Sequence, residues 1–330
     1  MNITVIGGGS WGLGLAKVLS DNNHQVMVFD VNEAIVQAIN EDHRCIQLDQ
    51  NIPESIQASD SCEKAVNFSE VLLFVVPTKV LRSALTEVIK HTTTPKLWLN
   101  AAKGIEPESF KRMSEIFDEL VPPKYLAGFA SISGPSHAEE VIKGMPTAVT
   151  CASIDEKHAL RCQEIFHNQA YFRVYTSTDL IGTELGGSLK NIFALASGIL
   201  RGQGLGDNAM AAVMTRGLVE MERFYNHFGA QSESLKGLTG IGDLIVTCTS
   251  NHSRNFQAGY QIGSGEDYNQ VLDSMSMVVE GIRTCEAAYH LAKKISIDTP
   301  IIDAIYDVIF NRVSPKKVTS RLLLRTSKAE

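Results

Sequence analysis

The sequence predicts an α/β fold in two parts: a doubly wound parallel sheet, followed by an all-helical C-terminal domain. Three observations support this prediction. Short β-branched runs alternate with helix-length amphipathic segments in the first half, a glycine-rich loop follows the first run, and long helical patterns fill the second half. The pattern changes near residue 178, which predicts domains at 1–178 and 179–330.

Six segments of the first half are expected to be strands. They are rich in β-branched and aromatic residues and are bounded by turn residues. In chain order they cover residues 3–6, 25–29, 71–76, 97–100, 127–131 and 148–151. Because ligands bind at the carboxyl ends of strands in open α/β sheets, the loops that leave these ends are expected to carry functional residues.

The second half has the pattern of helices with recognisable ends. Ser177-Thr178-Asp179 is expected to supply the capping and acidic first-turn residues of the first long helix, and Asp207 to cap a second helix that ends at Phe228 before Gly229. Apolar residues of the second helix predict core or a subunit interface, and they are Met210, Met214, Leu218, Met221 and Phe224. Residues 263–267 have the composition of a flexible loop, and the last few residues that of a frayed tail.

The composition is that of a globular chain of 330 residues. The net charge of −7 and the absence of a Lys/Arg cluster argue against nucleic-acid binding. The six cysteines are scattered without metal-site spacing, so we expect reduced thiols and no bound metal. No signal peptide precedes the first strand and no apolar stretch has the length of a membrane span, so we expect a cytoplasmic protein.

A glycine loop of the form Gly7-x-Gly9-x-x-Gly12 follows the first strand and opens a helix. The first glycine permits a tight turn, the second lets the backbone approach a pyrophosphate, and the third lets the helix pack on the strand. The helix N-terminus stabilises the phosphate charge. These features predict a dinucleotide-binding domain of the Rossmann type.

Asp30 ends the second strand, roughly 20 positions after the glycine loop. A carboxylate there accepts hydrogen bonds from the ribose 2'-hydroxyl of NAD(H) and repels the 2'-phosphate of NADP(H). NAD(H) is therefore the expected cofactor, and NADP(H) is the alternative. In a second interpretation Asp30 only forms the turn before Val31 and Asn32.

The segment Gly237–Asp243, followed by Ser253-Arg254-Asn255, combines glycines, a carboxylate and a guanidinium group. Because a guanidinium presents planar donors that suit phosphate, the segment predicts a site for a small anion. An ordinary polar loop with a surface ion pair is the alternative.

Lys190 lies on the first long helix of the second half, on a face of small and polar residues. The adjacent glycines Gly186 and Gly187 each cost about 1 kcal/mol relative to alanine in a helix, so another segment is expected to approach closely there. A solvated surface lysine is the alternative.

An ordered series of motifs over almost the whole chain resembles the bacterial-type NAD(P)-dependent glycerol-3-phosphate dehydrogenases. The motifs are Gly7-Gly8-Gly9-Ser10-Trp11-Gly12, Val76-Pro77, Lys103-Gly104, Ser133-Gly134-Pro135-Ser136, Pro146-Thr147-Ala148, Leu189-Lys190-Asn191, Gly204-Leu205-Gly206-Asp207-Asn208, the segment 237–255, and Val279-Glu280-Gly281. The resemblance implies reversible reduction of dihydroxyacetone phosphate to sn-glycerol 3-phosphate by a homodimer, which supplies phospholipid synthesis.

The resemblance also implies roles for particular residues. Lys190 would donate and accept the proton, with Lys103 and Asp243 as further catalytic residues. The implied substrate-binding residues are Lys103, Gly134, Ser136, Lys190, Asn191, Asp243, Thr247, Ser253, Arg254 and Asn255. The implied cofactor-binding residues are Gly7, Gly9, Ser10, Trp11, Gly12, Asp30, Lys103, Gly134, Ala138, Arg254, Val278 and Glu280.

The chain departs from the family pattern in two places, and two other functions stay open. Asp30-Val31-Asn32 stands where many members carry an arginine suited to a 2'-phosphate, and residues 42–53 lack the usual aromatic-Leu-Pro signature. One alternative function is a 3-hydroxyacid or ketopantoate-type reductase, which the segment from Asp243 to Asn255 disfavours. The other is a regulatory module that senses NAD without turnover, which does not need Lys190.

Overall fold

The computed structural model describes residues 1–275 and 278–324, so the predicted frayed tail lies outside the described residues. The chain forms two compact units. The first contains Met1–Lys103 and Arg112–Glu184, and the second contains Gly104–Lys111 and the chain from Leu185 onward. The division therefore falls inside a helix, and the short segment Gly104–Lys111 belongs to the second unit although it lies within the first half of the sequence.

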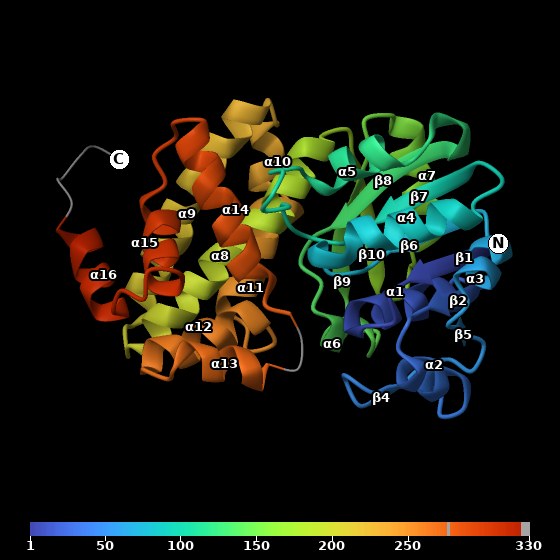
Figure 1. Ribbon diagram of the computed structural model, residues 1–330, viewed down its shortest axis with the longest axis horizontal. Coiled ribbons are helices and arrows are strands. Elements are labelled where there is room, and N and C mark those ends of the chain that lie inside the picture. Colours follow the sequence, from blue (N-terminus) through green and yellow to red (C-terminus); the bar gives the residue numbers. More distant parts are fainter. Residues whose placement is uncertain (276–277, 325–330) are drawn as a thin grey trace. The chain divides into compact units, whose positions relative to one another are not determined.

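A sheet forms the centre of the first unit and, in the described part of the chain, has eight strands in the order β10-β9-β8-β7-β6-β1-β2-β5 (Figure 1). The strands are β1 (Asn2–Ile6), β2 (Gln25–Phe29), β5 (Gln57–Ser59), β6 (Val71–Phe74), β7 (Lys96–Asn100), β8 (Leu126–Ser133), β9 (Thr147–Ala152) and β10 (Phe172–Ser177). Strands β3 (Arg44–Cys45) and β4 (Gln50–Asn51) form a separate antiparallel pair.

The predicted fold class is confirmed, with one antiparallel pair in a sheet that is otherwise parallel. Strands β8 and β9 run antiparallel, with Ser131 opposite Ala152. The alternation of strand and helix patterns predicts which segments are strands, but it does not determine the direction of each one. The carboxyl ends of the parallel strands β1, β2, β6, β7 and β8 lie along one edge.

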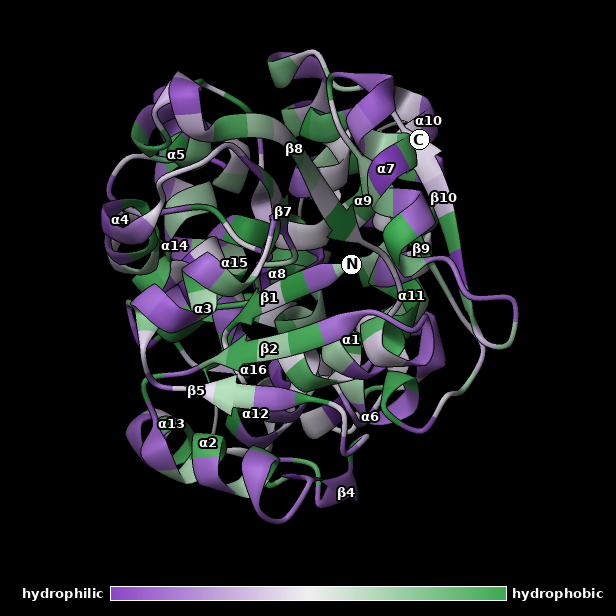
Figure 2. Ribbon diagram, turned by 90° about the vertical axis from the view of Figure 1, so that its right-hand side faces the viewer, coloured by the Kyte–Doolittle hydropathy of each residue, from purple (hydrophilic) through white to green (hydrophobic). Residues whose placement is uncertain are grey.

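Helices and apolar side chains cover both faces of the sheet. The helices of the first unit are α1 (Ser10–Asp21), α2 (Glu33–Asn40), α3 (Cys62–Phe68), η1 (Thr78–Val80), α4 (Leu81–His91), α5 (Met113–Leu120), η2 (Pro123–Tyr125), α6 (Ala138–Val141) and α7 (Glu156–Phe166). Successive side chains of a strand point to opposite faces. In β6, accordingly, Val71 and Leu73 join one apolar cluster, whereas Leu72 and Phe74 join the other. Strands β1 and β2 are correspondingly green, hence hydrophobic, over much of their length in Figure 2.

In the described part of the second unit, every regular element is a helix, as predicted. The helices are α8 (Leu180–Gly202), α9 (Asp207–Phe228), α10 (Ser232–Lys236), the π-helical turn η3 (Leu238–Gly242), α11 (Asp243–Thr249), α12 (Arg254–Ser264), α13 (Tyr268–Ser274), α14 (Glu280–Lys294), α15 (Pro300–Ile309) and α16 (Pro315–Leu323). The first residues of α8, up to Glu184, belong to the first unit.

Helix ends follow the predictions in part. Within the predicted capping segment 177–179, Asp179 is the residue that caps α8, since its Oδ1 accepts a hydrogen bond of 2.9 Å from the Gly182 amide. Gly229 ends α9 with φ +71°, also as predicted. The predicted cap at Asp207 is wrong: Gly206 is the N-cap and Asp207 is the first helical residue. The predicted loop 263–267 is shorter than expected, because α12 continues through its first two residues.

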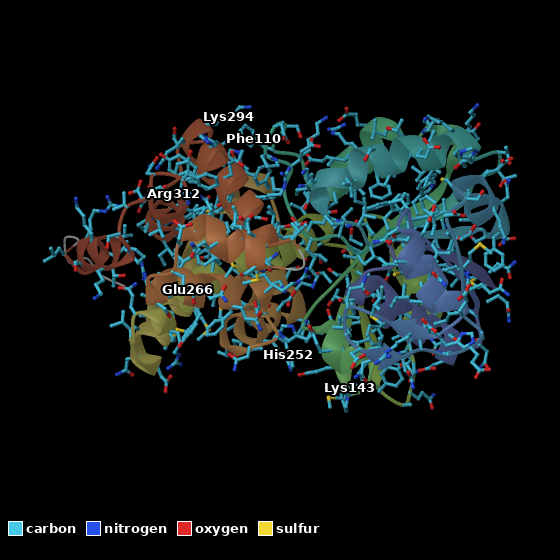
Figure 3. The ribbon with its side chains drawn as sticks, turned by 60° about the horizontal axis from the view of Figure 1, so that its bottom comes forward. Phe110, Lys143, His252, Glu266, Lys294 and Arg312 are labelled. Carbon is cyan, nitrogen blue, oxygen red and sulfur yellow. The ribbon has the colours of Figure 1, made fainter. Side chains whose placement is uncertain are left out.

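The segment Gly104–Lys111 packs within the second unit. The Lys294 Nζ atom lies 5.4 Å from the centroid of the Phe110 ring, a distance at which a cation is attracted by the ring face (Figure 3). Phe110 itself has φ +61°, a backbone conformation that a bulky residue rarely adopts. The chain therefore makes a specific contact with the second unit between two strands of the first.

The structure bears on three expectations, which concern the cysteines, the apolar residues of α9 and membrane-spanning helices. All six cysteines are free and buried, in agreement with the prediction of reduced thiols. Met210, Met221 and Phe224 of α9 are buried within the unit and therefore belong to its core. Among the described residues, no helix combines the length and the apolar character needed to cross a bilayer.

Candidate active site

The glycine loop lies between β1 and α1 and has the local structure that its sequence predicts. Gly7 has φ +110°, and a Cβ atom there would lie 2.6 Å from the Val75 carbonyl oxygen. A Cβ atom on Gly12 would lie 2.0 Å from the Gly7 carbonyl oxygen, so only glycine lets α1 pack against the turn. Gly9 is the N-cap of α1, and a Cβ atom placed there would have no other atom within 4 Å. The backbone at the helix N-terminus is therefore open to a ligand.

Asp30 follows β2 and contacts the glycine loop directly. Its Oδ2 accepts a hydrogen bond of 2.7 Å from the Gly8 amide, and its Oδ1 accepts one of 2.9 Å from the Asn32 amide. Asp30 therefore does form the turn before Asn32, as the second interpretation predicts. Because each carboxylate oxygen has a further lone pair, these contacts leave acceptor capacity for a hydroxyl group.

Three predicted substrate-binding residues of the first unit meet at the carboxyl ends of β7 and β8. The Lys103 Nζ atom donates to the Gly134 carbonyl oxygen at 3.0 Å, and the Ser136 hydroxyl donates to the same oxygen at 2.9 Å. Gly134 has φ +140°, and a Cβ atom there would lie 3.0 Å from the Val149 Cα atom. The turn after β8 therefore holds the side chain of Lys103 in a defined direction.

Three further predicted cofactor residues of the first unit lie at the starts of helices. Ser10 and Trp11 open α1, and Ala138 opens α6. Helices α1 and α6 are neighbours, since a Cβ atom on Gly14 would lie 3.9 Å from the Ala138 carbonyl oxygen. The predicted cofactor residues of this unit therefore lie in loops at the edge of the sheet and at the starts of α1 and α6.

A buried ion pair forms the centre of the candidate site in the second unit. Lys190 of α8 pairs with Asp243, the first residue of α11, and its Nζ also donates to the Thr247 hydroxyl at 2.9 Å. The exposed fractions of the three residues are 6%, 1% and 4%, which excludes the surface-lysine interpretation. Thr247 in turn donates to the Asp243 backbone carbonyl, one helical turn earlier.

Glycines bring α8 and the η3 turn into backbone contact beside this ion pair. A Cβ atom on Gly186 would lie 2.3 Å from the Thr239 carbonyl oxygen, and one on Gly240 would lie 1.9 Å from that of Leu235. The close approach predicted at Gly186 is therefore confirmed. The chain leaves η3 directly into Asp243, so this contact places the carboxylate against α8.

The start of α12 carries the predicted anion-binding residues. Ser253 is the N-cap and accepts a hydrogen bond of 3.2 Å from the Phe256 amide. Arg254 is exposed, and its Nη1 donates to the Val278 carbonyl oxygen at 3.3 Å. A guanidinium beside a helix N-terminus can bind an anion, because both the charge and the helix dipole favour it.

Asn255 connects three helices through its side-chain amide. Its Nδ2 donates to Asn191 Oδ1 at 3.0 Å, and its Oδ1 accepts from the Gly281 amide at 2.8 Å. A Cβ atom on Gly281 would lie 2.6 Å from the Asn191 carbonyl oxygen. Asn191 and Asn255 are therefore brought together as predicted, and the start of α14, where Glu280 lies, is fixed with them.

Sequence reasoning missed the glycines that let α8 and α12 cross. They are Gly198 and Gly202 on α8 with Gly259 and Gly263 on α12. A Cβ atom on Gly259 would lie 2.2 Å from the Leu195 carbonyl oxygen, and one on Gly263 the same distance from that of Ile199. The four-residue spacing on both helices was the available signal, because it places each pair of glycines on one helix face.

Sequence reasoning also missed Cys248, which lies next to the ion pair. Burial raises the pKa of the Cys248 thiol to about 12, and the charge of Lys190 opposes that rise. The thiol is therefore neutral at physiological pH and acts as a small apolar group in the wall behind Lys190.

The predicted site residues divide between the two units. Lys103, Gly134, Ser136 and most of the predicted cofactor residues belong to the first, and Lys190, Asn191, Asp243, Thr247, Ser253, Arg254, Asn255, Val278 and Glu280 belong to the second. Each set is assembled within its own unit. The first set surrounds an open helix N-terminus and the second surrounds a buried lysine, an arrangement suited to a nucleotide and to proton transfer, respectively.

Comparisons with known proteins agree with this division. Residues 2–159 match the family model for the N-terminal part of NAD-dependent glycerol-3-phosphate dehydrogenase, and residues 179–320 match that for the C-terminal part. The chain is 47% identical to a Staphylococcus aureus protein named glycerol-3-phosphate dehydrogenase (NAD(P)+), and the match covers 99% of each chain.

Solved structures give the same assignment. The crystal structure of glycerol-3-phosphate dehydrogenase from Coxiella burnetii matches with a TM-score of 0.92 and 33% identity, over 98% of this chain and 99% of that one. A ketopantoate reductase from Ralstonia eutropha matches with a TM-score of 0.61 and 15% identity, over 97% and 100% of the two chains, and so shares the fold alone. The chain therefore belongs to the family of NAD-dependent glycerol-3-phosphate dehydrogenases.

Proposed function

We propose that this chain reduces dihydroxyacetone phosphate reversibly to sn-glycerol 3-phosphate with a nicotinamide cofactor. The observation that carries the proposal is the buried pair of Lys190 and Asp243, held with Thr247 in the second unit. A buried ammonium with a fixed direction is a suitable proton donor for a ketone that is being reduced. Family membership over both halves of the chain supports the same reaction.

Lys190 is the proposed general acid and base. The bound nicotinamide supplies the hydride, and the oxygen of the ketone then needs a proton. The Asp243 carboxylate stabilises the ammonium form of Lys190, and the Thr247 hydroxyl fixes a second N–H direction. In the reverse direction the neutral amine accepts the hydroxyl proton. Lys103, held by the Gly134 carbonyl, is proposed as a further cation of the reaction.

Arg254 is proposed to bind the substrate phosphate, with Asn191 and Asn255 beside it. A hydrogen bond between charged groups contributes about 1.5–3 kcal/mol, so Arg254→Ala is expected to lower kcat/KM for dihydroxyacetone phosphate roughly 10- to 100-fold. Arg201→Ala is the matched control, because Arg201 is a half-exposed arginine of the same unit that pairs only weakly with an exposed aspartate. An unchanged kcat/KM in Arg254→Ala contradicts the assignment.

The first unit is proposed to bind the cofactor, with a preference for NAD(H) over NADP(H). The support is Asp30, whose carboxylate lies against the glycine loop and would repel a 2'-phosphate. The remaining predicted residues of the first unit, Ser10, Trp11 and Ala138, lie on the neighbouring helix starts. Arg254, Val278 and Glu280 are proposed as further cofactor-binding residues.

One assay separates the proposed function from its two alternatives. The purified chain is mixed with NADH and either dihydroxyacetone phosphate, a 3-oxo acid or ketopantoate, and the absorbance of NADH is followed. Loss of absorbance with dihydroxyacetone phosphate alone is expected. Loss only with an oxo acid or with ketopantoate would assign the chain to the other reductases, and NADH binding without turnover would make it a sensing module.

Three further proposals concern the location, the oligomeric state and the metabolic role of the protein. The chain is proposed to be a cytoplasmic homodimer whose product supplies phospholipid synthesis. Met214 and Leu218 of α9 are only partly buried, which leaves them available to an interface. Sedimentation at several protein concentrations tests the dimer directly, and a monomer at micromolar concentration contradicts it.

A further inference from the structure

Three peptide connections join the two units, and each has a polar residue on the side of the first unit. The connections follow Lys103, precede Arg112 and follow Glu184. Lys103 belongs to the candidate site, whereas neither Arg112 nor Glu184 does. These last two residues form an ion pair within the first unit, with 3.1 Å between Arg112 Nη1 and Glu184 Oε2.

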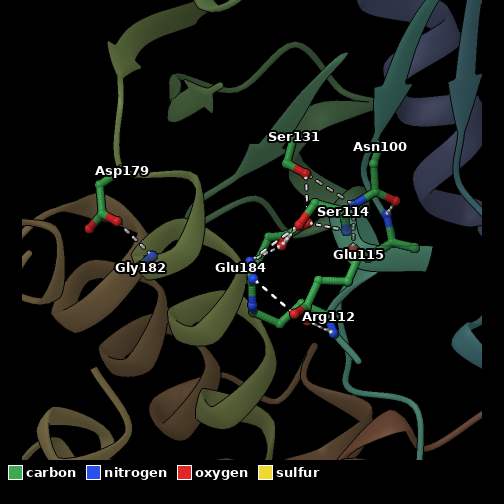
Figure 4. A network of polar contacts seen from close by, with 9 residues as sticks. Asn100, Arg112, Ser114, Glu115, Ser131, Asp179, Gly182 and Glu184 are labelled. Atoms are coloured by element: carbon green, nitrogen blue, oxygen red, sulfur yellow. Dashed lines mark hydrogen bonds and ion pairs between the residues drawn. The ribbon is translucent and has the colours of Figure 1, made fainter. Parts of the chain in front are cut away.

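Glu184 is the acceptor at the centre of a buried hydrogen-bond network (Figure 4). Besides Arg112, it accepts from the Ser114 amide at 2.9 Å and from the Ser114 hydroxyl at 2.6 Å. The Ser131 hydroxyl donates to it at 3.1 Å. The carboxylate thus fixes the start of α8 to the start of α5 and to the end of β8.

The same network reaches the strand that leads to Lys103. Asn100, the last residue of β7, donates from Nδ2 to the Ser131 hydroxyl at 3.3 Å. Its Oδ1 accepts from the Ala102 amide, and its Nδ2 donates to the Ala102 carbonyl, both at 3.1 Å. The chain just before Lys103 is therefore held by the network that holds Glu184.

The stability of the fold does not by itself explain why this carboxylate is buried. The Glu184 side chain is 4% exposed. Burial raises the pKa of Glu184, and the charge of Arg112 and the three donated hydrogen bonds oppose that rise. A buried ion pair often contributes little net stability compared with apolar residues of similar size, whereas it fixes geometry strictly. At the start of α8, fixed geometry has a use, because Lys190 lies on the same helix, about 9 Å further along its axis.

We propose that Glu184 is a positioning residue, which together with Arg112, Ser114 and Ser131 fixes the origin of α8 and thereby the place of Lys190 in the reaction. The inference rests on the proposed function, since it requires that Lys190 transfers the proton. The hydrogen bonds that Glu184 accepts from Arg112, Ser114 and Ser131 involve none of the predicted substrate or cofactor residues, so its proposed effect passes through the helix. A displacement of Lys190 by about 1 Å can lower the rate roughly 100-fold.

The test compares Glu184→Gln with a control in the wild-type and the Lys190→Ala backgrounds. Glu119→Gln is the matched control, because it removes a surface ion pair with Arg82 in the same unit. We expect Glu184→Gln to lower kcat roughly 10- to 100-fold, with the Kd for NADH within about twofold of the wild-type value. In the Lys190→Ala background the same substitution is expected to lower kcat no further, because residues that act as a unit are not additive.

Several outcomes would overturn the proposal. One is a folded Glu184→Gln enzyme with a kcat within about twofold of wild type, and another is an equal loss in both backgrounds. If Glu184→Gln does not fold, Ser131→Ala removes one donor and keeps the ion pair, and it must show the same dependence on Lys190 with a smaller loss. A wild-type chain that does not oxidise NADH with dihydroxyacetone phosphate overturns the proposed function itself, whereas an active wild type with an unaffected variant overturns only the role of Glu184.

Discussion

Replacing Gly259 by alanine adds one methyl group where α12 crosses α8. The new Cβ atom would lie 2.2 Å from the Leu195 carbonyl oxygen and 3.0 Å from the Ile199 amide nitrogen, whereas ordinary contact begins at 3.4 Å. The two backbones must therefore separate locally by about 3.4 − 2.2 = 1.2 Å. Neither contact is with a flexible side chain, so the helices themselves must move.

This separation reaches the candidate site through Asn255, one turn earlier on α12. Its hydrogen bond to Asn191 is 3.0 Å long, and a displacement of about an ångström can extend it beyond hydrogen-bonding distance. Overpacking of this kind costs about 1–3 kcal/mol, and the higher helix propensity of alanine offsets up to about 1 kcal/mol. The variant is therefore expected to fold, with its substrate-binding residues displaced.

The assay measures kcat/KM for dihydroxyacetone phosphate together with the Kd for NADH. For Gly259→Ala we expect kcat/KM for dihydroxyacetone phosphate to fall roughly 100-fold. The Kd for NADH is expected to change less, since the glycine loop belongs to the other unit, whereas Arg254 and Glu280 adjoin the displaced Asn255. Gly14→Ala is the matched control, because its Cβ atom would make only ordinary contacts of 3.6 Å or more in α1. A Gly259→Ala enzyme as active as this control would refute the reasoning that the crossing positions the site.

Two further predictions concern the cofactor and pH. Asp30→Ala removes the charge that would repel a 2'-phosphate, so the ratio of kcat/KM for NADPH to that for NADH is expected to rise at least tenfold, and a strong NADPH preference in the wild type contradicts the premise. Burial raises the pKa of Glu220 to about 8, although its carboxyl accepts hydrogen bonds from the Ile301 and Ile302 amides. The folded state then binds the proton more tightly than the unfolded state, so the free energy of unfolding is expected to fall by up to about 5 kcal/mol between pH 4.5 and 8. Denaturant titrations across that range check this decline, which Glu220→Gln should abolish.

Periodicity predicted the central strands and failed at the edges of the sheet. The strands β1, β2, β6 and β7 are largely apolar because both of their faces are buried, and such runs are easy to recognise. Strand β10 alternates buried with exposed residues at one edge, and β5 is three residues long at the other, so neither gave a sufficient signal. The antiparallel direction of β9 depends on tertiary pairing, which no local pattern encodes.

The parts of the site that could be predicted are those where the residue type and its local position indicate the chemistry, as in the glycine loop. The order of Gly7, Gly9 and Gly12 after a strand predicted a turn with an open helix N-terminus, and that turn is present. The partner of Lys190 was also within the predicted set, because Asp243 follows the glycine segment that brings it to α8.

What the sequence could not indicate depends on contacts between distant segments. The glycines of α12 weaken a helix when they are considered alone, and their value becomes visible only when α8 lies against them. In the sequence Glu184 cannot be distinguished from any other helix glutamate, because its hydrogen-bond donors lie on the distant elements α5 and β8. The segment Gly104–Lys111 joins the second unit through packing that follows no periodic pattern.

The central claim is that Lys190 transfers the proton, and single-turnover reduction of dihydroxyacetone phosphate by Lys190→Ala tests it most directly. We expect the rate of NADH oxidation to fall roughly 10²- to 10⁴-fold while the Kd for NADH is unchanged, because a positioned general acid contributes about that much. Lys236→Ala, which removes an exposed lysine of the same unit, should react at the wild-type rate. A Lys190→Ala enzyme that reduces the ketone at close to that rate would contradict the account.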